Sequence, residues 1–221
     1  MFQDSEFTAA CQELNKPDMD SEGYEFFTET HDQSYDVTIY RLYNEVSGLY
    51  SYKIYGALHD VPPELCIAVY MDLEYRKEWD SYVKELYEKE VGGKKLIYWH
   101  VKFPFPMSNR DYVYARELRE IQEGDNNKCY ILLAKSQECA DYPENSGVIR
   151  VDDYLSHIAI KSDGNGGCKA YMKYYDNPKG SIPTWLINWA AKTGVPGFLT
   201  ETYKACKGYD EYRQQQPQES S

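Results

Sequence analysis

A long series of strand-like runs is the feature that most restricts how this chain can fold. Turn-forming residues such as Gly92 and Gly93 separate one run from the next. Connections this short cannot carry a parallel crossover, which needs about a dozen residues or more. The sequence therefore predicts a large antiparallel sheet, with runs at about 82–90, 94–102, 110–121, 128–136, 147–160 and 168–176.

Two helices and three further strands are predicted before this series. Phe7, Ala10, Cys11 and Leu14 recur at the spacing of one helix face, and Pro63 suits the first turn of a second helix. Because no Pro- or Ser-rich linker divides the 221 residues, we expect one α+β domain. The expected elements are helices at 5–15 and 61–73, and strands at 25–30, 37–42 and 49–58.

The last element differs from the rest because it is apolar and helical in spacing. Pro183 precedes the apolar residues 185–191, a break follows at 194–197, and Phe198 and Leu199 resume the pattern. Such a helix must cover another apolar surface, which here is the concave face of the sheet. The space between the helix and the sheet is either packed solid or holds a ligand, and this pattern leaves both possibilities open.

Charge and cysteine usage exclude several classes of protein. The net charge is −12, which argues against a nucleic-acid partner. The six cysteines show no metal-ligand or redox spacing. The N-terminal residues lack the pattern of a secretory signal, and no window approaches the ~18 uninterrupted apolar residues of a membrane span. We therefore expect a soluble, cytoplasmic protein with free thiols.

Catalytic and cofactor motifs are absent from the sequence. It contains no G-x-S-x-G, no P-loop, no G-x-G-x-x-G after a strand and no H-E-x-x-H, and its four histidines are scattered. These patterns predict that the chain is not an enzyme and binds no cofactor. An abundance of tyrosine, 23 residues, suits either a half-buried sheet or an amphipathic cavity.

Several longer stretches resemble the START domain family of lipid-binding proteins. The resemblance runs from Phe7 to about Gly208, and it implies the helix-grip fold, a curved antiparallel sheet of nine strands packed around a long C-terminal helix. Residues 1–208 would form the lipid-binding domain, and 209–221 a polar tail that we expect to be disordered. The stretches that carry the resemblance are 70–80, 82–87, 105–114, 146–151 and 182–192.

The resemblance also implies roles for individual residues. By spacing alone, Arg76 and Asp80 form an i,i+4 pair on a helix surface; by resemblance, Arg76 holds a lipid phosphate and Asp80 orients it. Aromatic side chains would surround a choline group. Ser156 stands where the family has a glutamine, and its shorter side chain would need a water molecule to reach the lipid. The implied lipid-binding residues are Tyr70, Arg76, Asp80, Trp99, Tyr112, Tyr154 and Ser156.

The function implied is that of an intracellular carrier that holds one phosphatidylcholine molecule in an internal tunnel and moves it between membranes. Two acyl chains require a tunnel larger than an ordinary small-molecule pocket. The C-terminal helix would be the door and touch the membrane transiently, although the same side chains could simply pack on the sheet. The expected door residues are Trp185, Leu186, Trp189, Gly194, Pro196, Phe198 and Leu199.

Three alternatives remain open at this point. The chain could carry phosphatidylethanolamine as well as phosphatidylcholine. It could act as a lipid-sensing regulator of a partner enzyme, for which the resemblance suggests an acyl-CoA thioesterase. It could also be an enzyme, since helix-grip relatives include cyclases and hydrolases, but that reading lacks a catalytic motif.

Overall fold

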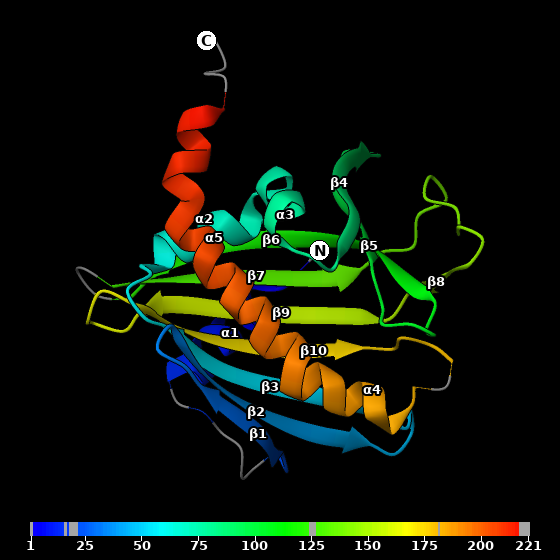
Figure 1. Ribbon diagram of the computed structural model, residues 1–221, viewed down its shortest axis with the longest axis horizontal. Helices are drawn as coiled ribbons and strands as arrows, with labels where there is room; N and C mark the ends of the chain where they lie inside the picture. The colour runs from blue at the N-terminus through cyan, green and yellow to red at the C-terminus, as the bar shows by residue number, and fades with distance from the viewer. Residues whose placement is uncertain (1, 16, 18–21, 124–126, 181, 217–221) are drawn as a thin grey trace.

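A computed structural model describes residues 2–15, 17, 22–123, 127–180 and 182–216 of the chain. A single curved sheet carries helices on both of its faces (Figure 1). The described strands are β1 (Glu25–His31), β2 (Tyr35–Asn44), β3 (Leu49–Leu58), β4 (Val83–Val91), β5 (Lys94–Val101), β6 (Asn109–Gln122), β7 (Lys128–Ser136), β8 (Val148–Val151), β9 (Tyr154–Ser162) and β10 (Cys168–Asp176). The described helices are α1 (Asp4–Asn15), α2 (Pro63–Met71), α3 (Leu73–Trp79), α4 (Thr184–Trp189), the π-helical turn η1 (Ala190–Gly194) and α5 (Val195–Gln215).

Nine strands form the antiparallel path that the sequence predicts. Their order is β1-β2-β3-β10-β9-β7-β6-β5-β4, and every neighbouring pair along it is antiparallel. Along this path, strands joined by a short connection pair as hairpins, for example β2 with β3 and β4 with β5. The predicted fold class, α+β with a nine-stranded curved antiparallel sheet and a long C-terminal helix, is confirmed.

The run at 147–160 is two strands, where the sequence indicated one. Asp152 and Asp153 separate β8 from β9, and β8 leaves the path to pair in parallel with β6. Buried charge holds β8 in place, because Arg150 donates to both carboxylate oxygens of the fully buried Asp111, at 2.8 and 3.0 Å. The long connection from 137 to 147 makes this parallel pairing possible.

The predicted helix at 61–73 is also interrupted. Asp72 adopts an extended conformation between α2 and α3, and its side chain accepts a hydrogen bond from the Tyr75 N–H at 2.9 Å. An aspartate in this position ends one helix and caps the next, because its carboxylate satisfies a free N–H. The cap sets the direction of α3, which carries Arg76.

The C-terminal helix is longer and more continuous than the sequence suggests. The expected break at 194–197 is helical: the Val195 N–H donates to the Ala190 carbonyl in the π-turn, and α5 continues directly. Pro196 lacks an N–H for the helical ladder, which accounts for a local irregularity here without a gap.

The tail predicted over 209–221 is wrong for residues 209–215, which are helical. Tyr209 is buried, its hydroxyl donates to Asp72 Oδ2 at 2.9 Å, and its ring lies 5.2 Å from that of Tyr75. Residues 209–221 are mostly polar, which led to the prediction of a disordered tail, but Tyr209 and Tyr212 give the helix an apolar face that packs on the core. Residues 217–221 of the predicted tail lie outside the described residues.

The two faces of the sheet have different partners. Helix α1 packs its buried side chains on the outer face against Cys129, Ile131, Leu133 and Ala159. Helices α2 and α5 lie over the concave face, and α4 and α5 cross it diagonally (Figure 1). Within the described ranges, no helix is long and apolar enough to cross a membrane.

Candidate functional site

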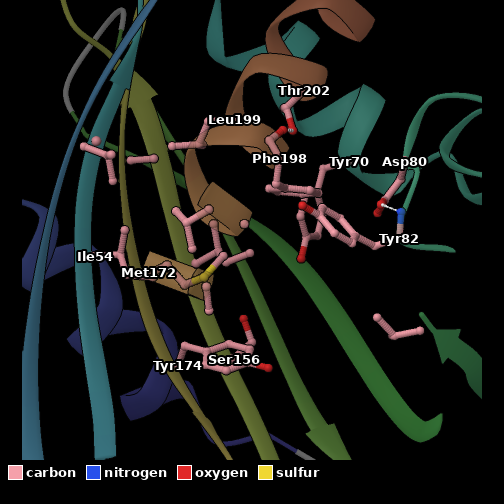
Figure 2. A pocket seen from close by; sticks show the side chains of 18 of the residues that line it. Ile54, Tyr70, Asp80, Tyr82, Ser156, Met172, Tyr174, Phe198, Leu199 and Thr202 are labelled. Carbon is pink, nitrogen blue, oxygen red and sulfur yellow. Dashed lines mark hydrogen bonds between the residues drawn. The ribbon is translucent and has the colours of Figure 1, made fainter. Parts of the chain in front are cut away.

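A cavity of about 430 Å³ lies between the concave face of the sheet and the C-terminal helices. Strand alternation explains its apolar wall, since every second residue of β9 and β10 faces it. Figure 2 shows Ile54, Met172 and Leu199 directed into this space from two strands and α5. The interior is therefore hollow. Its volume falls within the range of about 300–1,000 Å³ that is ordinary for small-molecule pockets, so it is smaller than the tunnel that we expected for two acyl chains.

Arg76 and Asp80 place a buried ion pair at the edge of this apolar space. Arg76 is 5% exposed and Asp80 3%, and Arg76 Nε donates to Asp80 Oδ2 at 2.9 Å. The surface pair that spacing alone indicates is wrong, because α3 turns this face toward the cavity. Asp80 Oδ1 also accepts from the Tyr82 N–H at 3.0 Å, which fixes the carboxylate at the end of α3.

The guanidinium of Arg76 is surrounded by aromatic rings. Its Cζ lies 5.3 Å from the ring centroid of Tyr70, 5.1 Å from that of Trp99 and 5.7 Å from that of Phe198. Burial disfavours the charged form, but neighbouring Tyr70 and Asp80 outweigh it and raise the pKa of Arg76. The Nη1 and Nη2 groups make no hydrogen bond to a described residue, so a permanent cation keeps free donors here.

Trp99, Tyr112 and Tyr154 come together as one aromatic cluster. The ring centroids of Trp99 and Tyr112, which are paired across β5 and β6, are 5.0 Å apart, and those of Tyr112 and Tyr154 are 5.4 Å apart. Trp99 and Tyr154 line the cavity, whereas Tyr112 lies behind them. The Trp99 indole N–H is buried and has no partner among the described residues.

Two cavity tyrosines extend this cluster and were missed by the sequence reasoning. The ring centroid of Tyr154 lies 5.4 Å from that of Tyr114 and 5.9 Å from that of Tyr174. Tyr114 stands two residues after Tyr112 on β6 and therefore on the same face. That alternation was the signal in the sequence.

Asp176 was also missed, and it is the carboxylate next to this cluster. Tyr112 donates its hydroxyl hydrogen to Asp176 Oδ2 at 2.8 Å, and Tyr174 stands two residues before Asp176 on β10. Burial raises the pKa of Asp176 above its usual value, against the opposing effect of the Tyr112 hydrogen bond and of Arg110. A carboxylate thus lies beside the aromatic cluster, behind the residues that line the cavity.

Ser156 and Tyr70, two other residues implied by the resemblance, also line the cavity. Ser156 is 2% exposed and lies two residues from Tyr154 on the same face of β9. All seven implied lipid-binding residues therefore lie at this cavity or, for Tyr112, directly behind its wall.

The door residues divide into two groups. Leu186, Trp189, Gly194, Phe198 and Leu199 line the cavity, whereas Trp185, which is 44% exposed, and Pro196 are not among the lining residues. Gly194 has an ordinary helical φ of −64°, and a Cβ there would lie 3.3 Å from the Trp189 ring. Close packing on Trp189 therefore explains the glycine in this conformation.

Three contacts hold the C-terminal helices against the α3–β4 turn. Ser81 Oγ donates to Glu201 Oε2 at 3.1 Å. The ring centroids of Tyr82 and Trp189 are 6.1 Å apart, and those of Trp79 and Phe198 are 5.7 Å apart. Together with a second hydrogen bond, from the Ser81 N–H to Glu201 Oε2 at 3.4 Å, these contacts join the expected door segment to the α3–β4 turn.

Comparison with known proteins identifies relatives over almost the whole chain. The START domain model matches residues 5–211. The phosphatidylcholine transfer protein of Bos taurus is 50% identical over 208 residues, covering 94% of this chain and 95% of that protein, and its Homo sapiens counterpart is 48% identical over the same coverage. The crystal structure of human STARD10 superposes with a TM-score of 0.77 at 25% identity, covering 97% of this chain and 83% of that one.

Proposed function

The chain belongs to the START domain family, and from that premise we propose that it is an intracellular carrier that holds one phosphatidylcholine molecule and moves it between membranes. The observation that carries this proposal is the buried Arg76 guanidinium, which has free donors beside aromatic rings at the edge of an apolar cavity. The relatives that are about half identical to this chain are named phosphatidylcholine transfer proteins, which supports the same cargo.

The energetics of lipid movement require an apolar cavity and no catalytic group. Two acyl chains contain some 30 methylenes, and at about 0.8 kcal/mol each their exposure to water costs roughly 25 kcal/mol. A carrier lowers this barrier by offering the chains a comparable environment, here a wall of residues such as Ile158, Ile160 and Met172. We therefore propose no reaction and no cofactor, only the lipid as cargo.

The polar end of the cavity suits a phosphocholine group. We assign the phosphate to the free Nη donors of Arg76, because a guanidinium offers a planar fork to phosphate oxygens. Asp80 holds that fork in place, and Tyr70 and Ser156 supply nearby hydroxyls. A quaternary ammonium has no N–H donor, so ring faces such as those of Trp99 and Tyr154 are its natural partners.

Entry of a whole lipid requires the C-terminal helices to move away from the sheet, because the closed cavity is of ordinary pocket size. Two exposed aromatic side chains border the same opening: Trp185 on α4, and Phe105, 94% exposed, in the β5–β6 loop whose Phe103 and Pro104 line the cavity. We propose that these side chains enter the bilayer interface when the door opens. Cytoplasmic location and regulation of a thioesterase remain predictions of the resemblance.

Lipid analysis of the purified chain tests this function. The full chain is incubated with vesicles of mixed phospholipids, reisolated and examined by mass spectrometry. We expect one choline phospholipid per chain. Trp99→Ala should weaken the binding of choline phospholipids more than the binding of phosphatidylglycerol. Recovery of no phospholipid, or of all head groups in proportion to the vesicles, would contradict the proposal.

A further inference from the structure

We propose that the Asp176 carboxylate selects the positive charge of the lipid head group, so that the aromatic cluster and this residue together recognise a cation. The inference rests on the proposed carrier function and goes beyond it, because it adds the full negative charge of a carboxylate to the weaker attraction of the ring faces. Asp176 ends β10 on the concave face, two residues after the cavity residue Tyr174 and opposite Tyr154 in the strand register.

One hydrogen bond connects Asp176 to the rings that would contact the cation. Tyr112 donates to Asp176 Oδ2 at 2.8 Å, and the ring centroid of Tyr112 lies 5.4 Å from that of the cavity residue Tyr154. A phenol that donates to a carboxylate becomes more electron-rich, and a more negative ring face attracts a cation more strongly. The carboxylate also contributes its own field in a site from which burial excludes most water.

Asp176 has no ion-pair partner among the described residues, although it is partly buried. The nearest cation, Arg110, gives its donors to the backbone carbonyls of Ser108, Pro178 and Lys179. A desolvated carboxylate without a partner is costly, and a bound cation would compensate that cost.

A continuous series of contacts through two rings connects the two charges. Arg76 lies on one side of Trp99, and Asp176 lies beyond Tyr112, the ring next to Trp99. A head group whose phosphate meets Arg76 would therefore direct its ammonium toward the rings that Asp176 polarises. A purely structural Asp176 would need only to accept the Tyr112 hydrogen bond, which asparagine does equally well.

The experiment compares phosphatidylcholine with phosphatidyl-3,3-dimethylbutanol, in which a carbon replaces the choline nitrogen and the shape is kept without the charge. Equimolar vesicles are offered to the full chain, and mass spectrometry gives the ratio of the two lipids bound. We expect the wild type to favour phosphatidylcholine, and Asp176→Asn to reduce that ratio about tenfold. The control Asp153→Asn removes an equal charge from a neighbouring exposed position and should leave the ratio unchanged.

The outcomes separate this inference from the carrier function. If the wild type binds both lipids equally, or if Asp176→Asn keeps the wild-type ratio, the inference is overturned while the carrier function stands. If the wild type extracts neither lipid, the carrier function itself fails.

A second measurement serves if Asp176→Asn does not fold. The wild-type ratio is then compared between about pH 7 and about pH 4, where Asp176 takes up a proton while the facing groups Arg110, Tyr112, Tyr174 and Tyr52 keep theirs. Asp153, the other acid near Asp176, is exposed, and Asp153→Asn measured at both pH values is the control. We expect the ratio to fall on acidification, and a constant ratio would overturn the inference.

Discussion

Arg76 Nε and Asp80 Oδ2 are 2.9 Å apart within a single turn of α3, and both side chains are almost fully buried beside an apolar cavity. A buried ion pair adds little to stability compared with apolar residues of the same volume. Its presence at this position is therefore best explained by a charged ligand, and this explanation can be tested by separating stability from binding.

Arg76→Ala should lose lipid binding at least tenfold and also lose about 3 kcal/mol of unfolding free energy, because it leaves the Asp80 charge buried without a partner. The double variant Arg76→Met with Asp80→Asn should recover most of that stability and none of the binding. Urea unfolding and vesicle extraction measure the two effects, with exposed Lys77→Ala as the control. Normal extraction by the double variant would place the phosphate elsewhere.

Joining the C-terminal helix to the α3–β4 turn should stop transfer. Ser81 and Glu201 share a hydrogen bond across the closed door, so Ser81→Cys with Glu201→Cys can be bridged by a short bifunctional maleimide. We expect the bridged protein to keep any lipid already bound and to exchange none, as measured by fluorescent lipid transfer between vesicles. The single variants treated in the same way are the controls. Unchanged transfer in the bridged protein would show that the lipid uses another opening.

Asp176→Asn should raise the melting temperature of the lipid-free protein at neutral pH. Burial raises the pKa of Asp176 in the folded state, so the folded protein binds its proton more tightly than the unfolded chain does. Stability contributed by this residue therefore increases as pH falls through the raised pKa, and the advantage of asparagine should disappear at low pH. Calorimetry between about pH 7 and about pH 4 measures this difference. A lower melting temperature at neutral pH would show that the hydrogen bond from Tyr112 outweighs desolvation.

Truncation after Gly208 should destabilise the fold by about 3 kcal/mol or more, because it removes the buried Tyr209 ring and its hydrogen bond to Asp72. Truncation after Gln216 keeps all of α5 and should leave stability unchanged. Chemical unfolding measures the stability of the two shortened chains. If they were equally stable, the predicted end of the domain at residue 208 would be correct.

The sequence by itself determined the sheet and the apolar C-terminal helix. Strand alternation, turn residues and helical spacing are local properties, so they specify elements such as the β2–β3 hairpin and α1 wherever those elements later pack. Most of the binding residues followed from the family resemblance, since the spacing of Arg76 and Asp80 alone indicated only a surface pair.

Only the tertiary structure decided which of these residues share a site. Tyr112 and Asp176 are 64 positions apart, and the hydrogen bond between them depends on how β6 and β10 curve around the cavity. The burial of Arg76, the interruption at Asp72 and the helical residues after Gly208 depend in the same way on what covers them. Burial and charge pairing are set by residues distant in sequence, and no local pattern contains that information.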